Sequence, residues 1–150
     1  MHRSQNLHFY LHKVVGLMDK RVDHALQEEV DLTLSQFLIL MGLECQGHCA
    51  QQRIAEFLDV TQAAVSRQVE LLREKKLIER LENPENRREH ILELTAVGKE
   101  KLAHATTVIA QQSEKLLAVI NAEERELLQS ALKKLLEGQL EDSDCFPHKK

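Results

Sequence analysis

A short polar run between two apolar segments carries the groups that could recognise a nucleic acid. Gln62 and Arg67 lie close together in the chain, with Thr61, Ala63 and Ser66 around them. A glutamine amide can pair with adenine through two hydrogen bonds, and an arginine can pair with guanine or bind a phosphate. Hydroxyl groups and the backbone N–H groups of a helix start suit phosphate oxygens. The small Ala63 allows close approach of the backbone or contact with a thymine methyl.

Helical periodicity predicts that these groups share one face. Val65, Val69 and Leu72 recur at the spacing of a buried helix side. At about 100° of rotation per residue, Ala63 and Arg67 then point outward, flanked by Gln62 and Ser66. Glu70 and Glu74 also point outward, further along the helix. Phosphates would repel these carboxylates. We therefore expect the N-terminal half of the helix to enter a DNA groove while the C-terminal half tilts away.

A second basic cluster follows, at the tip of a predicted hairpin. Two short apolar segments, 78–81 and 90–94, read as strands around a polar tip that contains Asn86, Arg87 and Arg88. An arginine at such a tip can enter the minor groove, where a narrow A·T-rich stretch concentrates negative potential. The neighbouring glutamates at 82, 85 and 89 support the alternative of a solvated turn, but we prefer the minor-groove interpretation.

The elements that must position these groups are mostly helical. Thr33 and Gln36 form a predicted capping box, and Thr95 and Asn121 are further cap signals. We expect 44–49 to be a loop. The predicted helices span about 7–26, 33–43, 50–58, 61–75, 95–120 and 121–136, with the leucines at 127, 128, 132 and 135 turned inward in the last. The order helix, tight turn, helix, hairpin predicts a winged helix-turn-helix, in a mostly α fold with a small β-hairpin wing.

Composition agrees with this fold class and sets limits on function. The chain has 150 residues, with 5 Gly, 2 Pro, no Trp and 3% aromatic residues, which favours helices over a β-sandwich. The longest apolar run, 37–43, is far short of a membrane span, and the N-terminus lacks a signal-peptide core. We therefore expect a cytoplasmic protein without membrane contact. The net charge of −4 argues against tight non-specific DNA binding, although not against a site-specific dimer.

Other function classes find little support in the sequence. The glycines at 16, 42, 47, 98 and 138 form neither a phosphate-binding loop nor a dinucleotide-binding fingerprint. The chain contains no nucleophile elbow and no HExxH motif, so we expect neither an enzyme nor a cofactor. The stronger rival is a winged-helix module that buries the Gln62 and Arg67 face against another protein.

Several segments together resemble the MarR family of bacterial transcription regulators. Residues 86–95 read NRREHILELT where the family pattern is Asp-x-Arg-x-x-x-Leu-x-Leu-Thr. Further similar segments are LTLSQ at 32–36, VSR at 65–67, LIER at 77–80 and TAVG at 95–98, and the resemblance extends from about residue 7 to 136. Asn86, Lys76 and Asp59 depart from it, since the family commonly has aspartate at the first position and glycine at the other two.

The resemblance implies a homodimeric repressor, less often an activator, that binds a pseudo-palindromic operator in double-stranded DNA. It places a helical dimerisation region at 7–31 and 96–137 and a winged-helix region at 33–95, in one domain. The polar composition of 139–150 predicts a flexible tail. The apolar excess of the terminal helices also favours a dimer, which would hold two recognition helices roughly 34 Å apart. A ligand pocket between the two regions is implied as well.

Three kinds of regulatory signal remain open. A small aromatic or phenolic effector is common in the family, although no residue identifies its pocket. A metal could use His8 with His12, one helical turn apart, or the loop residues Cys45, His48 and Cys49; the alternatives are a solvated helix end and a small buried thiol. Peroxide sensors of the family carry a reactive cysteine in the first helix, where this chain has none, although Cys45 and Cys49 could still react if their pKa were lowered. Our primary expectation is therefore that the chain has no metal site.

Overall fold

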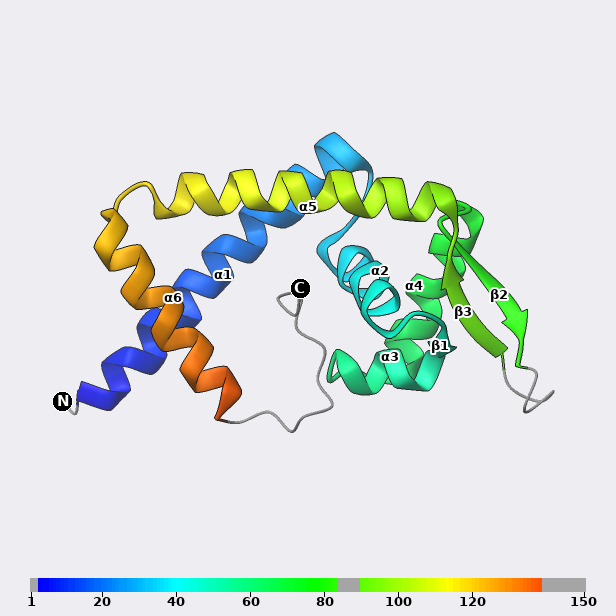
Figure 1. Ribbon diagram of the computed structural model, residues 1–150, viewed down its shortest axis with the longest axis horizontal. Helices are drawn as coiled ribbons and strands as arrows, with labels where there is room; N and C mark the ends of the chain where they lie inside the picture. Colours follow the sequence, from blue (N-terminus) through cyan, green and yellow to red (C-terminus); the bar gives the residue numbers. More distant parts are fainter. Residues whose placement is uncertain (1–2, 84–89, 139–150) are drawn as a thin grey trace.

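The computed structural model describes residues 3–83 and 90–138 and shows a mostly helical chain with a small sheet (Figure 1). In chain order the elements are α1 (Arg3–Val30), α2 (Leu34–Gln46), β1 (Cys49–Ala50), α3 (Gln51–Phe57), α4 (Gln62–Glu74), β2 (Ile78–Glu82), β3 (His90–Leu94), α5 (Ala96–Leu117) and α6 (Ala122–Glu137). The wing tip at 84–89 and the tail at 139–150 lie outside the described residues, and Cys145 with them.

Helix α5 is the central support of the molecule. It runs along one side of it and packs against the C-terminal half of α1, while its own N-terminus abuts the winged region (Figure 1). Buried apolar residues from both helices, among them Leu26 and Val108, join those of α2, α3, α4 and the sheet in one core. A single core therefore connects the terminal helices to the region that carries the candidate site.

The helix starts predicted from cap residues are confirmed. Thr33 Oγ1 accepts a hydrogen bond from the Gln36 N–H, and the Gln36 side chain accepts one from the Thr33 N–H, both at 3.2 Å. Asn121 and Glu124 form the same reciprocal box at 2.9 Å. Thr95 caps α5 by accepting from the Gly98 N–H. Local chemistry of this kind can be read from a sequence because all its partners lie within one helical turn.

The sheet contains a strand that the sequence analysis did not predict. Within the described residues it has three antiparallel strands in the order β1-β3-β2. Cys49 pairs with Leu92, and Ile78 pairs with Leu94 in the hairpin. The predicted loop at 44–49 is therefore wrong at both ends, because α2 continues to Gln46 and β1 begins at Cys49. A strand of two residues has no periodicity of its own and exists only through its pairing with β3.

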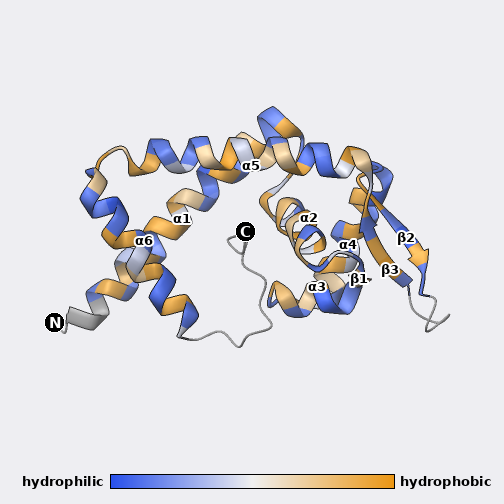
Figure 2. Cartoon of the chain, in the orientation of Figure 1, coloured by the Kyte–Doolittle hydropathy of each residue, from blue (hydrophilic) through white to orange (hydrophobic). Residues whose placement is uncertain are grey.

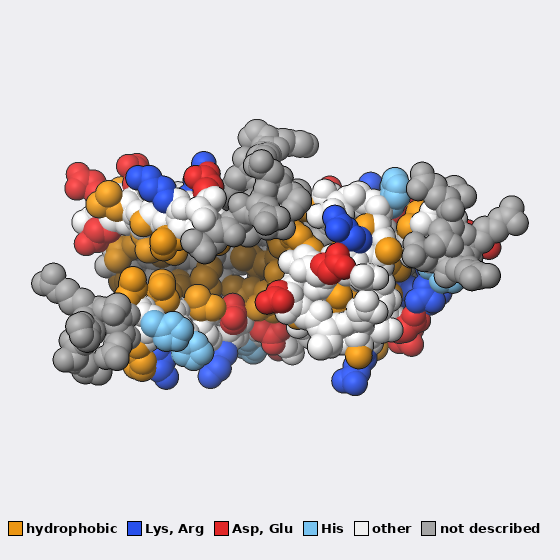
Figure 3. All heavy atoms as spheres, turned by 90° about the horizontal axis from the view of Figure 1, so that it is seen from below, with side chains coloured by type: hydrophobic (Ala, Val, Ile, Leu, Met, Phe, Trp, Pro, Cys, Tyr) orange, Lys and Arg blue, Asp and Glu red, His pale blue; other side chains and the backbone are white. Residues whose placement is uncertain are grey.

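The leucines of α6 are exposed in the single chain, so the prediction that they turn inward into its core is wrong. None of the residues of α6, all of which are described, is buried, and Leu127 is 72% exposed. The N-terminal half of α1 is similar: Leu7 is 58% exposed, whereas the same stripe is buried from Val22 onward. Figure 2 shows apolar residues along both helices, and Figure 3 shows them gathered around a hollow between these helices and the winged region.

Candidate nucleic-acid interface

The tight turn between α3 and α4 depends on Asp59. This residue has φ +52°, in the left-handed region, and the N–H of Val60 reaches back to the carbonyl oxygen of Ala55 at 3.0 Å. Aspartate tolerates this conformation better than most residues other than glycine. Thr61 then caps α4 by accepting from the Ala64 N–H at 3.2 Å. The turn thus sets the direction in which α4 leaves α3.

Helix α4 presents the side chains that the periodicity predicted. Its inner face, formed by Val65, Val69 and Leu72, is buried in the core. On the outer face, Thr61, Gln62, Ala63 and Arg67 are exposed, and Ser66 is partly exposed. The structure thus brings five of the eight predicted DNA-contacting residues together on one surface. The other three, Asn86, Arg87 and Arg88, lie outside the described residues.

Helix α4 ends at a strained residue. Lys76 has φ +58°, and the N–H of Leu77 bonds to the carbonyl oxygen of Leu72 at 3.0 Å, which is the helix-ending pattern usually served by glycine. The Thr95 hydroxyl donates to the carbonyl oxygen of Lys76 at 2.8 Å. The end of the recognition helix is therefore held directly by the start of α5.

A hydrogen bond between a buried amide, Gln36, and a partly buried one, Gln68, fixes α4 against α2. Gln36 is 4% exposed, and its side-chain N–H donates to the side-chain oxygen of Gln68 at 3.2 Å. Its oxygen is occupied by the Thr33 N–H. Breaking a buried pair on one side leaves a polar group unsatisfied, at a cost of about 1–3 kcal/mol. Gln68 lies on the side of α4, so this bridge resists rotation of the helix about its axis. Sequence reasoning identified the cap but not the bridge, whose partners are 32 residues apart.

An ion pair and a hydrogen bond from Lys75 join the end of α4 to the corner between α1 and α2. Lys75 Nζ lies 3.0 Å from a carboxylate oxygen of Asp31 and 2.6 Å from its backbone oxygen. The hydrogen bond from Lys75, followed by its charge, lowers the pKa of the Asp31 carboxyl below its ordinary value. Asp31 itself has φ +54°. This contact connects the recognition helix to the helix that begins the chain.

The sequence pattern predicts only that the carboxylate of Glu70 points outward, whereas the structure pairs it with two arginines. One oxygen lies 2.8 Å from a guanidinium nitrogen of Arg73, and the other lies 2.9 Å from one of Arg80 on β2. Glu74, one turn further on, forms no ion pair with any described residue. The two glutamates therefore differ in their electrostatic effect, and only the tertiary structure distinguishes them.

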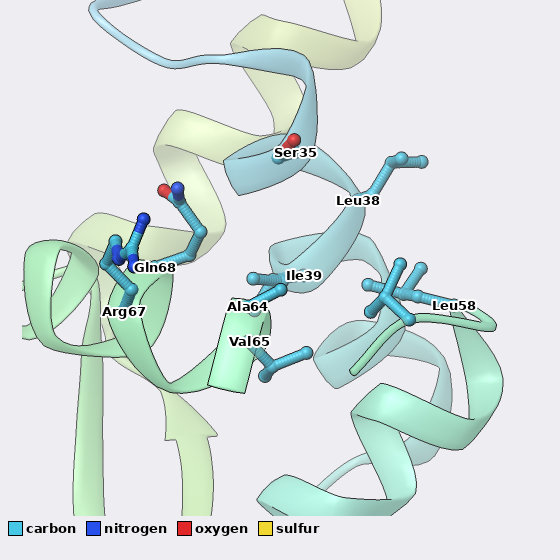
Figure 4. A pocket seen from close by; sticks show the side chains of 9 residues that line it. Ser35, Leu38, Ile39, Leu58, Ala64, Val65, Arg67 and Gln68 are labelled. Carbon is cyan, nitrogen blue, oxygen red and sulfur yellow. The ribbon is translucent and has the colours of Figure 1, made fainter. Parts of the chain in front are cut away.

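A small pocket of about 200 Å³ opens between α2 and α4 (Figure 4). Its walls are mostly apolar, with Leu38 and Ile39 from α2 and Leu58 from the end of α3. Arg67 and Gln68 close one end of the pocket with polar groups. The pocket lies inside the winged region, whereas the resemblance implied a pocket between this region and the terminal helices.

The candidate metal ligands do not assemble into a site. The rings of His8 and His12 stack, with centroids 6.4 Å apart. In the parts of the chain that the structure describes, no three or more His, Cys, Asp or Glu side chains are grouped so as to hold a metal ion, and Cys45, His48 and Cys49 are no exception. Burial raises the pKa of the Cys49 thiol, and the charge of Arg53 acts in the opposite direction. A raised pKa disfavours the thiolate that an oxidation sensor requires.

No described helix is long and apolar enough to cross a membrane.

The fold and the exposed face of α4 define the class of protein: a winged helix-turn-helix transcription regulator that binds DNA. Residues 32–90 match the family model "MarR family". A related protein, the uncharacterised HTH-type transcriptional regulator YdcH of Bacillus subtilis, is 32% identical over 135 residues, covering 87% of this chain and 90% of YdcH. The multiple antibiotic resistance protein MarR of Escherichia coli is 26% identical over 130 residues, covering 84% and 90%.

Solved structures agree with these relatives. Wild-type apo MarR from E. coli superposes with a TM-score of 0.81 at 27% identity, covering 87% of this chain and 96% of that one. A mutant of the same E. coli protein, complexed with operator DNA, gives 0.75 at 26% identity, covering 87% and 94%. The chain belongs to the MarR family, which consists of transcription regulators and not of enzymes.

Proposed function

We propose that this chain is a homodimeric, ligand-responsive repressor that reads a pseudo-palindromic operator with α4. The observation that carries the proposal is the geometry of α4: its inner face is locked in the core while Gln62, Ala63 and Arg67 face solvent. The MarR structure complexed with operator DNA has the same fold, and a relative 31% identical to this chain is the transcriptional repressor NicR of Pseudomonas putida.

In this proposal the N-terminal half of α4 enters the major groove. Gln62 and Arg67 read base edges, Ala63 permits close approach, and Thr61 and Ser66 bind phosphates. The Gln36–Gln68 bridge and the Lys75–Asp31 contact would hold this helix at a fixed angle. Asn86, Arg87 and Arg88 complete the interface from the wing, as the sequence pattern predicts.

The dimer rests on the apolar surfaces that one chain leaves exposed. The outward leucines of α6 and the N-terminal half of α1 are the kind of surface that a second copy would cover. We assign 7–31 and 96–137 to dimerisation and 33–95 to DNA binding, within one domain. Two-fold symmetry would then place the recognition helices roughly 34 Å apart, one turn of DNA.

The effector is proposed to be a small aromatic or phenolic molecule. The pocket of about 200 Å³ lies below the roughly 300–1,000 Å³ usual for ligand sites, so it suits a single ring. Arg67 forms part of its wall, and an occupant would therefore compete with DNA for this side chain. A panel of phenols should raise the melting temperature and weaken operator binding together; stabilisation without weaker binding would contradict the coupling.

Selection of bound duplexes from a random pool tests DNA binding most directly. We expect a two-fold related sequence whose half-sites are about one helical turn apart. Affinity for the selected duplex should fall steeply between low and moderate salt, since phosphate contacts release counterions. If no sequence is enriched and any binding is insensitive to salt, the rival interaction with a protein partner would be favoured. A reporter gene placed behind the selected operator would then distinguish repression from activation.

A further inference from the structure

One carboxylate on the recognition helix engages two arginines. The two oxygens of Glu70 contact different guanidinium groups, Arg73 at 2.8 Å and Arg80 at 2.9 Å. Arg73 lies on the same helix, three residues on, whereas Arg80 lies on β2, the strand that leads to the wing. The three side chains remain 49%, 38% and 30% exposed, respectively, so the cluster is at the surface and not in the core.

The position of this cluster relates it to the DNA-reading face. Glu70 follows Ser66 by four residues and Arg67 by three, and residues at these separations are neighbours on a helix surface. The cluster is thus the next turn of the face that carries the proposed base contacts. Arginines at this place would otherwise be free to bind phosphates of the duplex, each adding to sequence-independent affinity.

We propose that Glu70 acts as a brake on non-specific DNA binding by holding Arg73 and Arg80 away from the phosphates. The inference rests on the proposed function and assigns Glu70 a role in specificity, because phosphate contacts raise affinity for every sequence while base contacts do not. The overall charge of −4 acts in the same direction. Glu74, which forms no ion pair with any described residue, contributes charge but holds no arginine.

The alternative is that the cluster only clamps α4 to β2. In that case, loss of the Glu70 charge would loosen the recognition helix and weaken binding to all duplexes. Glu70→Gln separates the two roles, because the amide retains the size and one acceptor oxygen but loses the charge that holds both guanidinium groups. Glu74→Gln is the matched control: it changes the net charge equally, on the same helix, without releasing an arginine.

The experiment measures affinity for the selected operator and for a scrambled duplex across a salt series. Each added phosphate contact steepens the slope of log affinity against log salt by about 0.9. On the scrambled duplex, we expect Glu70→Gln to add one or two phosphate contacts, made by the released Arg73 and Arg80. The ratio of affinity at 50 mM salt to that at 200 mM should therefore rise about 3.5- to 12-fold relative to the parent protein. Glu74→Gln should change this ratio by less, and the double variant Glu70→Gln/Arg80→Gln should lose the part of the gain that Arg80 supplies, keeping at most the one contact of Arg73.

The outcomes are distinguishable. The proposal would be overturned by a Glu70→Gln variant that melts like the parent but whose salt slope on the scrambled duplex is no steeper than that of Glu74→Gln. Weaker binding of Glu70→Gln to both duplexes would show that the cluster only holds α4 against β2, and would also overturn the proposal. If Glu70→Gln failed to fold, Arg80→Gln would be measured instead: an arginine held away from DNA should leave the salt slope of the scrambled duplex unchanged when it is removed, whereas a slope shallower by about 0.9 would show that Arg80 already binds a phosphate and would overturn the proposal. A parent protein that binds no duplex would instead refute the proposed function.

Discussion

At the scale of single residues, Arg67 is the side chain whose role is most directly measurable. It stands exposed on the outer face of α4. Because a bidentate arginine contact to guanine contributes about 1–3 kcal/mol, Arg67→Ala should weaken operator binding by that amount in a gel-shift titration. Operator affinity equal to that of the parent protein would show that Arg67 does not contact the operator.

The backbone at Gly98 leaves no room for a side chain. A Cβ at this position would lie 2.0 Å from the carbonyl oxygen of Leu77, a backbone atom that cannot move aside. We expect Gly98→Ala to lower the free energy of unfolding by about 3 kcal/mol or more in a denaturant titration.

Gly16→Ala provides the control for the glycine prediction. No described atom lies within 4 Å of a Cβ at this position in α1, so the change should stabilise the helix by about 0.5–1 kcal/mol. If both substitutions proved neutral, the close contact between the start of α5 and Leu77 would be in doubt.

At the scale of elements, the end of α4 carries a backbone strain that can be relieved. Lys76 holds φ +58°, a conformation that costs a residue with a Cβ about 1–2 kcal/mol. Lys76→Gly should therefore stabilise the protein relative to Lys76→Ala by roughly 1 kcal/mol, measured by thermal unfolding. Both variants lose the same charge, so their difference isolates the backbone effect. An alanine variant as stable as the glycine variant would mean that the strain is absent in solution.

The elements also differ in how much of them a sequence reveals. The caps of α2, α5 and α6 could be predicted because their donors and acceptors are neighbours in the chain. The strand β1 could not, since Cys49 gains its partner only when Leu92 is brought beside it. The same reasoning applies to the Gln36–Gln68 bridge and to the pairing of Glu70 with Arg80, which join elements distant in sequence.

At the scale of the whole molecule, the exposed leucines of α6 require a partner if the dimer proposal holds. Leu128 lies on the apolar side of this helix and is 41% exposed within one chain. Leu128→Glu should shift the protein towards a monomer in sedimentation velocity, because an unpaired carboxylate would be buried in the interface. Ser130→Glu adds the same charge on the opposite side and should leave the dimer intact. A dimer that persists in Leu128→Glu would place the interface elsewhere.

The sequence by itself determined the order of elements, the cap residues and the outward face of α4, because helical periodicity and capping depend on residues within a few positions of one another. It also carried the family motifs, from the wing to the start of α5. Only the tertiary structure decided which charges on that face are compensated, how α4 is held in place, and that the leucines of α6 remain uncovered by their own chain. Those features depend on contacts between distant segments, and periodicity can say that a residue is apolar without saying which surface covers it.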